Sequence, residues 1–484
     1  MAMPQAKRAR NASRPRSSAA AAADPPRSSG WFSGRRGPSA SRRADDDGTP
    51  LHEEIILFIF ATFLDIADLV RCAATCRRWR RLVSGDAAFI CRGLQRPGPG
   101  GKFIPPLAVG YFRQHDADTI HFVPMAPALR RFPLLREPTS PSVMLVGDVR
   151  FDTSRIVTSR NGLIVIELRR GKHSRTLKLC VCNPMTGEVR ALPPLTGKDG
   201  VGYYACTVLT ADDYQYQVQN SDAGTPPPSA SHYRLLMVYN RRDFTAFRSY
   251  SSEDGGGWGP ERKVTGARLG KRHMRLTHGG VVACGGRAAY WKTSGGGVFG
   301  LRLDTLEATK VSLLEVVGGG EAPAFNVLNT LLGMAPDGRL CAVQLSLPFL
   351  QTQQGKSSVD TITIRVTSCG GGHGGVVDNG ILQQGNCLWM KESSIKIMHS
   401  FPGNVHSTKV KLQWFCEKSG LVFFTAGKND GDQRGDLYTL SLSTRVVEKV
   451  ASNAWDGNMW DNLYGYEMDQ AAYLASLAGT EKED

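Results

Sequence analysis

The sequence predicts a multi-domain α+β chain in which a small helical unit precedes a large all-β domain. One observation is a very apolar run at residues 55–64, followed by two shorter segments with helix-start signals. Another is a series of short apolar runs between turn residues from about residue 142 onward, the first at residues 143–146. The run at residues 361–366 alternates, which puts Ile362, Ile364 and Val366 on one face of a strand. No amphipathic helix longer than about three turns stands out in that region, which favours strands.

The chain is long enough for two or more folded units and a large core, since it has 484 residues. Hydrophobic residues make up 41% and charged residues 21% of it, as in ordinary globular proteins. The net charge of +15 is unevenly spread, because residues 1–44 hold ten Lys or Arg and a single acid, Asp24. The remainder is only mildly basic, which makes nucleic acid an unlikely partner.

Residues 1–48 are predicted to be a disordered basic tail, since they contain almost no large apolar side chains. Lys7–Arg10 fits a nuclear import signal, and the Arg- and Ser-rich composition also fits an organelle transit peptide. A solvated basic tail is the simplest interpretation. Because no secretory signal is present, the eleven cysteines are expected to be reduced, in the nucleus and/or cytoplasm.

Helix signals begin near residue 49. Thr49 can cap a helix, Pro50 suits its first position, and Glu53 and Glu54 fit the first turn. Asp65 can cap a second helix. The first helix is apolar around nearly its whole circumference, so it should be buried on all sides. A ten-residue run is too short for a membrane span, so either the β domain or a partner protein must cover it.

These residues resemble an F-box. The resemblance rests on the run from Leu51 to Phe60, on Leu64-Asp65 with Asp68-Leu69, and on Cys76-Arg77-Arg78-Trp79. His52 stands where the family usually has proline. The resemblance implies a three-helix F-box at residues 49–95 that binds a Skp-type adaptor, and through it a cullin. The residues that it assigns to adaptor binding are Leu51, His52, Glu54, Ile55, Ile56, Ile59, Phe60, Leu69 and Trp79.

Residues 96–141 are predicted to be a linker or connector, because Arg96–Gly101 breaks the helical pattern. Apolar patches at 109–112 and 121–124 are either first strands or a packed connector. Residues 142–475 should form the β domain, most simply an irregular β-propeller, with a β-sandwich as the alternative. An acidic tail is expected at 476–484. Polar insertions at 220–231, 351–358 and 428–435 should be loops.

One local pattern recurs in the β region: a strand, a tight polar turn with Thr nearby, and another strand. It occurs at residues 181–189, 301–307 and 440–447, at unequal intervals. The first of these, with Ser159–Leu163 and Leu463–Asp469, resembles the associated domain of plant F-box proteins. That resemblance implies a propeller that holds an unknown protein substrate.

Motifs for catalysis are weak. Gly295-x-Gly297-x-x-Gly300 and Gly370-x-Gly372-x-x-Gly375 match a dinucleotide spacing, but neither opens a predicted helix, so both should be turns. Cys180-x-Cys182 lacks a second pair at zinc spacing and should be buried. The basic run Arg77–Arg81 could contact nucleic acid, but Trp79 fits better as a packed helix residue.

The family resemblance implies a non-catalytic, cofactor-free subunit of an SCF-type ubiquitin ligase that recruits a target for ubiquitin-dependent degradation. The alternative is a propeller that binds a small ligand or acts as an enzyme, with the F-box as a regulatory handle. A deep central pocket lined by converging His, Asp and Arg would favour the alternative.

Overall fold

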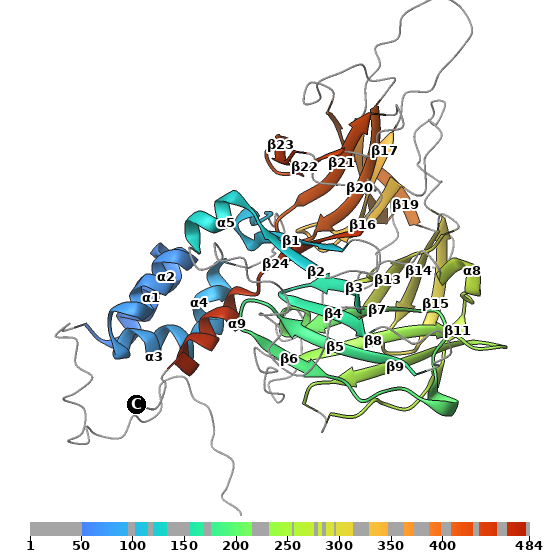
Figure 1. The fold of residues 1–484 in the computed structure, drawn as a ribbon, viewed down its shortest axis with the longest axis horizontal. Coiled ribbons are helices and arrows are strands. Elements are labelled where there is room, and N and C mark those ends of the chain that lie inside the picture. Colours follow the sequence, from blue (N-terminus) through green and yellow to red (C-terminus); the bar gives the residue numbers. More distant parts are fainter. Residues whose placement is uncertain are drawn as a thin grey trace, which may run out of the picture. The chain divides into compact units, whose positions relative to one another are not determined.

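The structure is a computed structural model (Figure 1). It describes residues 51–94, 102–114, 120–132, 154–168, 176–214, 232–253, 256–274, 279–282, 287–294, 297–312, 329–346, 363–371, 387–397, 408–428, 435–452 and 462–480. The expected tail at 1–48 and the strand expected at 143–146 lie outside these ranges. The expected loops at 220–231 and 351–358 also lie outside them, as do residues 429–434 of the loop expected at 428–435.

The N-terminal unit has four helices where three were expected: α1 (Glu53–Phe63), α2 (Ile66–Thr75), α3 (Arg77–Gly85) and α4 (Ala87–Leu94). Asp65 caps α2 as predicted, because its carboxylate accepts a hydrogen bond from the backbone N–H of Asp68 at 2.9 Å. The start predicted for α1 was wrong. The helix begins at Glu53, with His52 as a capping residue that makes no side-chain bond, so Pro50 is not its first residue.

The described strands form six sheets, so the β-sandwich alternative is wrong. The first two are β3 (Ser154–Arg160), β4 (Leu163–Leu168), β5 (Lys178–Asn183), β6 (Glu188–Ala191), and β7 (Tyr204–Thr210), β8 (Tyr233–Asn240), β9 (Thr245–Ser251), β10 (Arg262–Lys263). The third is β12 (Val281–Val282), β13 (Ala288–Lys292), β14 (Gly297–Arg302) and β15 (Glu307–Ser312), with β11 (Thr265–Gly266) parallel to β15.

The remaining three sheets follow in chain order. They are β16 (Thr330–Met334), β17 (Leu340–Ser346), β18 (Thr363–Gly371), β19 (Cys387–Lys396), then β20 (Thr408–Cys416), β21 (Leu421–Lys428), β22 (Gly435–Ser441), β23 (Val447–Ala451), and finally β24 (Asn462–Glu467) with β1 (Ala108–Gln114) and β2 (Ile120–Pro124). In β18, Ile364 and Val366 are buried, as the alternation predicted, while Ile362 lies outside the described ranges.

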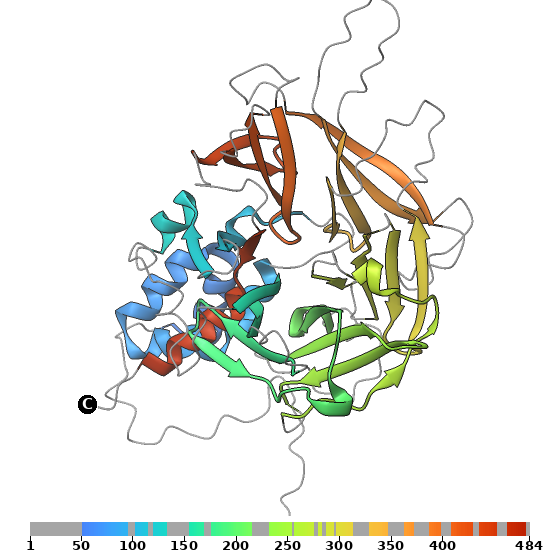
Figure 2. The same cartoon turned by 45° about the vertical axis from the view of Figure 1, so that its right-hand side comes forward.

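The six sheets surround a centre, as Figure 2 shows. One strand of each sheet faces that centre, and each of these strands contacts the next: β3 with β7, then β12, β16, β20, β24 and again β3. This closed ring of inner strands is a six-bladed β-propeller.

The last blade closes the ring with strands from both ends of the described chain. β24 pairs antiparallel with β1, with Tyr111 opposite Gly465, and β1 pairs with β2. β-Sheet therefore begins at residue 108, inside the segment expected to be a connector, and well before residue 142. At Gly110 a Cβ atom would lie 2.5 Å from the carbonyl oxygen of Val123, so only glycine fits there.

The recurring strand–turn–strand pattern occupies one place in three blades, the hairpin between the third and fourth strands. In each hairpin a backbone N–H donates to the carbonyl oxygen four residues earlier in the chain. These bonds join Gly187 to Asn183 at 2.9 Å, Leu306 to Arg302 at 3.1 Å and Arg445 to Ser441 at 2.8 Å. The donor has positive φ each time, 74°, 56° and 59°. The sequence similarity therefore reflects one shared turn geometry.

The other described helices are short. They are η2 (Pro105–Leu107), α5 (Ala126–Arg131), η4 (Gly197–Asp199), α7 (Ala211–Tyr214), α8 (Lys271–Met274), α9 (Gln470–Ser476) and η9 (Leu477–Thr480). α9 and η9 occupy residues 470–480, so helix extends into the segment expected to be an acidic tail.

Candidate functional site

The apolar helix α1 is buried on one side only. Ile56 and Phe60 are each 3% exposed, whereas Ile55 is 47%, Phe58 60% and Phe63 70% exposed. Positions 55 and 58 lie on the helix face opposite 56 and 60. The expectation of burial on all sides is therefore wrong for this chain alone, because the β domain does not cover the outer face of α1.

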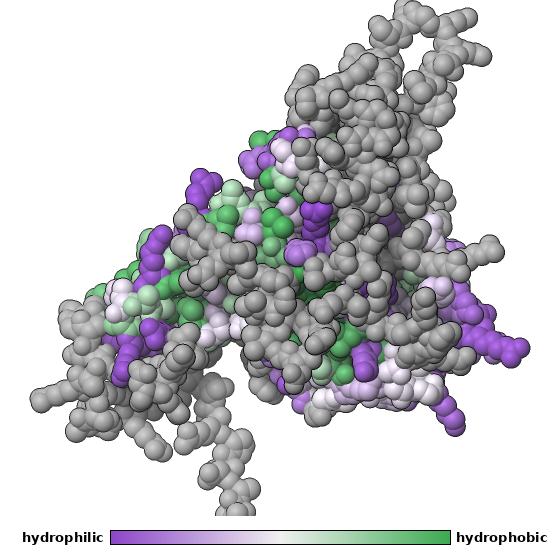
Figure 3. Space-filling view, in the orientation of Figure 1, coloured by the Kyte–Doolittle hydropathy of each residue, from purple (hydrophilic) through white to green (hydrophobic). Residues whose placement is uncertain are grey.

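The exposed apolar surface of α1 is defined as Ile55, Phe58 and Phe63 together with Leu51, which lies just before the helix. The rings of Phe58 and Phe63 meet edge to face with centroids 6.4 Å apart. Figure 3 shows green, hydrophobic side chains gathered over the region of α1 and α2. An exposed cluster of this kind is typical of a protein–protein contact.

Three of the residues assigned to adaptor binding lie in the core. Ile56, Phe60 and Leu69 are buried, and Phe60 meets the half-buried ring of Trp79 edge to face at 5.8 Å. Such residues hold α1, α2 and α3 together and cannot touch a partner directly without rearrangement. Of the other assigned residues, Leu51, His52, Glu54 and Ile55 are exposed, and Ile59 is half-buried.

Arginines in the basic run of α3 contact other residues of the same chain. Arg78 donates to the carbonyl oxygen of Leu51 at 2.7 Å, and Arg81 pairs with Glu53 at 3.2 Å. Arg80 donates to the carbonyl oxygen of Ala73 at 3.1 Å. These contacts support the interpretation of Trp79 as a packed helix residue. Cys76 caps α3, because its Sγ accepts from the backbone N–H of Trp79 at 3.4 Å, a role that the sequence analysis missed.

Helix α9 joins the helical unit to the propeller. It follows β24 and lies against α3 and α4, as the red and blue helices in Figure 1 show. Leu474 is fully buried, and Tyr473 meets Phe132 edge to face at 5.6 Å. One continuous cluster of buried side chains runs from Ile56 in α1 to Tyr466 in β24. The helical unit and the propeller therefore share a core.

Ser159–Leu163 and Leu463–Asp469, two motifs about 300 residues apart that resemble the F-box-associated domain, meet next to the start of α9. Ser159 donates to the carbonyl oxygen of Gly465 at 2.9 Å, and Tyr466 donates to that of Gly162 at 3.1 Å. Asp469 caps α9 by accepting from the backbone N–H of Ala472 at 3.0 Å. The motifs thus serve ring closure and the start of α9.

Charged groups are concentrated around this junction. Arg160 forms a two-pronged pair with Asp213, with both distances 2.7 Å, and lies 3.6 Å from Glu417. Lys418 pairs with Asp212. Burial raises the pKa of Glu417 to about 7, and burial with the nearby charge of Asp212 raises the pKa of Asp469 to about 6.

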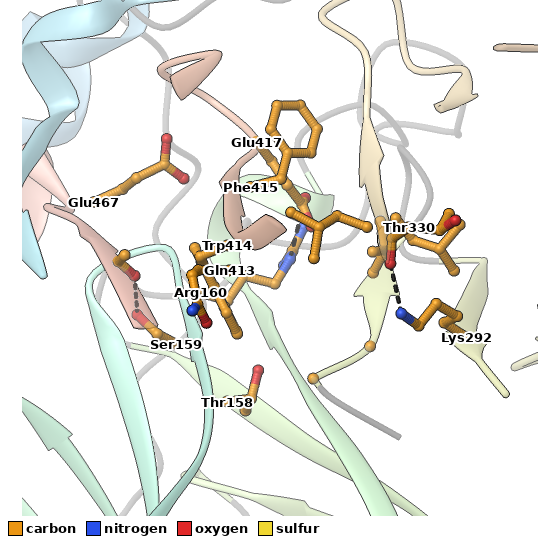
Figure 4. A pocket seen from close by; sticks show the side chains of 16 residues that line it. Thr158, Ser159, Arg160, Lys292, Thr330, Gln413, Trp414, Phe415, Glu417 and Glu467 are labelled. Carbon is orange, nitrogen blue, oxygen red and sulfur yellow. Dashed lines mark hydrogen bonds and ion pairs between the residues drawn. The ribbon is translucent and has the colours of Figure 1, made fainter. Parts of the chain in front are cut away.

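The central cavity of the propeller has a volume of about 50 Å³. Among the described residues, its lining includes Ser159, Arg160, Lys292, Glu417 and Glu467, but no His or Asp (Figure 4). Lys292 donates to the carbonyl oxygen of Thr330 at 2.5 Å, and burial lowers its pKa to about 8. A small-ligand pocket is usually several hundred Å³. A deep pocket lined by converging His, Asp and Arg, which would favour the enzyme alternative, is therefore not seen among the described residues.

Other candidate sites give no support for cofactor chemistry. Gly297 and Gly300 lie within strand β14, and Cys180 and Cys182 are buried in β5. Within the described ranges, no group of His, Cys, Asp and Glu is arranged to hold a metal ion. No described helix is long and apolar enough to cross a membrane.

Comparison with known proteins supports the helical unit most directly. Residues 53–90 match the model of the F-box-like family. No curated protein matches the chain. Similar solved structures include the β-propeller domain of Cps50 (Swd1) from Myceliophteria thermophila, with 9% identity, a TM-score of 0.33, and coverage of 72% of this chain and 85% of that one.

The periplasmic gluconolactonase PpgL from Pseudomonas aeruginosa has 12% identity and a TM-score of 0.34, over 72% of this chain and 83% of that one. Such low identities and TM-scores carry no argument about the function of this chain. From the helical unit and the ring of sheets, we conclude that the chain carries an F-box-like domain at residues 53–90 followed by a six-bladed β-propeller.

Proposed function

We propose that this chain is a non-catalytic, substrate-recruiting subunit of an SCF-type cullin–RING ubiquitin ligase. Its F-box-like domain would bind a Skp-type adaptor, and through it a cullin, in the nucleus and/or cytoplasm. The propeller would hold a target protein for ubiquitin-dependent degradation. The observation that carries this proposal is the exposed apolar surface of α1 on a domain that matches the F-box-like model.

The energetics favour a partner on that surface. Covering a large apolar side chain gains about 1.5–3 kcal/mol. The rings of Phe58 and Phe63 already contact each other, so little side-chain freedom would be lost on binding. The nine residues assigned by family resemblance then divide into two roles. Leu51, His52, Glu54, Ile55 and Ile59 would touch the adaptor, whereas Ile56, Phe60, Leu69 and Trp79 would support them from within.

The shared core suits a subunit that acts by proximity. A subunit without chemistry of its own works by raising the concentration of the target near the ubiquitin carrier. Because α9 fixes the F-box-like domain to the propeller, the target would be presented at a set distance from the adaptor.

The test is calorimetry of the full chain with a purified Skp-type adaptor. Ile55→Asp with Phe58→Asp should abolish measurable binding, because both side chains are exposed and the fold does not need them. The matched control is Tyr203→Asp with Val446→Asp, which puts two acids at exposed apolar positions of the propeller. The control should bind like wild type. Unchanged adaptor binding in the α1 variant would overturn the proposal.

A further inference from the structure

A groove on the propeller lies apart from both α1 and the central cavity. Its volume is about 960 Å³, and its lining consists of Gly202, Asn240, Arg241, Arg242, Arg268, Gly270 and Lys271. These residues come from three places: the segment before β7, the end of β8 with the turn that follows it, and the segment from β11 to the first residue of α8. The last segment crosses from one blade to the next, because β10 pairs with β9 and β11 with β15.

Four of the seven lining residues are cationic, and none is acidic. Arg241 is neutralised by Glu261, with which it pairs at 2.5 Å. Arg242, Arg268 and Lys271 are exposed, and no ion pair to them is seen within the described part of the chain. The acid nearest in sequence is Asp243, which is exposed beside Arg242 in the turn. The groove therefore holds three positive charges to which no described residue forms an ion pair.

The walls of the groove are held in place by hydrogen bonds. Arg241 donates to the carbonyl oxygens of Gly200 at 3.0 Å and Lys198 at 3.1 Å, and its guanidinium lies over the ring of Tyr239 at 4.9 Å. This ties the β8–β9 turn to the segment before β7. Across the groove, Asn240 donates to the carbonyl oxygen of Leu269 at 2.6 Å.

The third segment is tied to its neighbours in the same way. Arg268 donates to the carbonyl oxygen of Arg242, and the backbone N–H of Ala267 donates to that of Ala308 at 2.8 Å. The three cations are therefore presented on fixed walls, which lowers the entropy lost when an anionic ligand binds.

We propose that this groove binds an acidic, Asp- and Glu-rich peptide segment of the target protein. The proposal rests on the proposed function, because it assumes that the propeller binds a target protein. Carboxylates suit the site because Arg binds them with two parallel hydrogen bonds and Lys adds a point charge. No atom lies within 4 Å of a Cβ built on Gly202, so the main chain is open to a peptide at that wall.

Nucleic acid fits the groove less well. Binding a phosphate backbone calls for a broad basic face, with many Lys and Arg along the path of the strand. Here Glu261, Asp243 and Asp199 stand among the basic residues of the same loops. An acidic peptide needs only the local match of three cations to a few carboxylates.

The test uses the full chain and a short fluorescein-labelled peptide of alternating Glu and Gly, followed by fluorescence anisotropy at physiological salt. Arg242→Glu with Arg268→Glu and Lys271→Glu should weaken binding by about tenfold or more. The matched control, Lys102→Glu with Lys178→Glu and Lys310→Glu, makes the same change in net charge at exposed lysines elsewhere. It should stay within about twofold of wild type.

An uncharged substitution tests whether the peptide binds in the groove. Gly202→Trp fills space at the groove wall and should also weaken peptide binding. The proposal is overturned if the groove variant binds the peptide as tightly as its control does. That result is expected if the peptide binds to the basic N-terminal residues instead of the groove. It is also overturned if a Gln-and-Gly peptide binds as well, or if only a single-stranded oligouridine depends on the groove.

Adaptor calorimetry on the same proteins separates this proposal from the proposed function. The groove variant should bind the Skp-type adaptor like wild type. If the wild-type chain does not bind the adaptor but binds the acidic peptide through the groove, the ligase proposal is wrong and the groove proposal is supported. If adaptor binding holds while groove-dependent peptide binding is absent, only the groove proposal fails.

Discussion

Gly162 and Asp469 touch so closely that no side chain fits at position 162. A Cβ atom built on Gly162 would lie 2.7 Å from both the Cβ and the backbone nitrogen of Asp469. Gly162 also has a φ of +79°, and its N–H donates to the carbonyl oxygen of Glu467 at 2.8 Å. The turn between β3 and β4 is thereby held against the residue that caps the start of α9.

Gly162→Ala should therefore destabilise the protein by about 3 kcal/mol, since backbone strain and a collision with main-chain atoms add together. Gly187→Ala is the matched control. Gly187 has a similar φ of +74°, but a Cβ atom there meets nothing within 4 Å. The control should cost about 1 kcal/mol, from strain alone. Urea denaturation measures both, and equal losses would contradict the role of the Asp469 contact.

The stability of the junction should depend on Glu417. Burial raises its pKa from 4.5 to about 7, although Arg160 opposes the shift. Because the folded state holds the proton more tightly than the unfolded state, the contribution is complete below pH 4.5 and is lost as pH rises through 7. Compared with Glu417→Gln, which is neutral throughout, wild type should lose up to roughly 3 kcal/mol between pH 4.5 and 8.

Denaturant melts at a series of pH values check this, with the exposed Glu188→Gln as the control. The control keeps Glu417, so it should lose stability over the same pH range as wild type. A Glu417→Gln protein whose stability follows wild type at every pH would contradict the burial of an ionisable carboxyl here.

His52→Pro should strengthen adaptor binding by up to about 1 kcal/mol, because proline fixes the start of α1 before the partner arrives. The structure meets the condition for this gain. His52 has φ −63° and ψ 146°, which proline adopts without strain, and no hydrogen bond from its N–H is seen in the described part of the chain. Calorimetry decides it, and weaker binding would mean that Leu51-His52 is wrongly aligned with the family's Leu-Pro.

Local patterns in the sequence predicted local structure well. The cap at Asp65, the strand alternation at Ile364 and Val366, and the three similar hairpins all depend on neighbours within a few residues. Two hairpins place Leu306 and Arg445 at positive φ without a glycine to signal it. Their turn geometry was visible only as a weak likeness to the hairpin of Gly187.

Features that depend on distant partners could not be predicted. Whether a face of α1 is covered is decided by the placement of the other elements, so an apolar run cannot distinguish Ile56 from Ile55. The pairing of β1 with β24 joins segments about 350 residues apart in the chain. The groove draws its cations from separate loops, so no run of Lys and Arg marks it, whereas the visible run at Arg77–Arg81 is used internally.

The pairing of β24 with β1 also sets the order in which the protein matures on the ribosome. The four helices and the strands β1 and β2 come well before their partners β24 and α9 in the chain, so they are synthesised long before those partners. A prematurely terminated chain that ends before residue 462 lacks both the inner strand of the last blade and the helix beneath the F-box-like domain. Only a chain that extends through α9 can therefore close the ring of blades and join it to the F-box-like domain through the shared core.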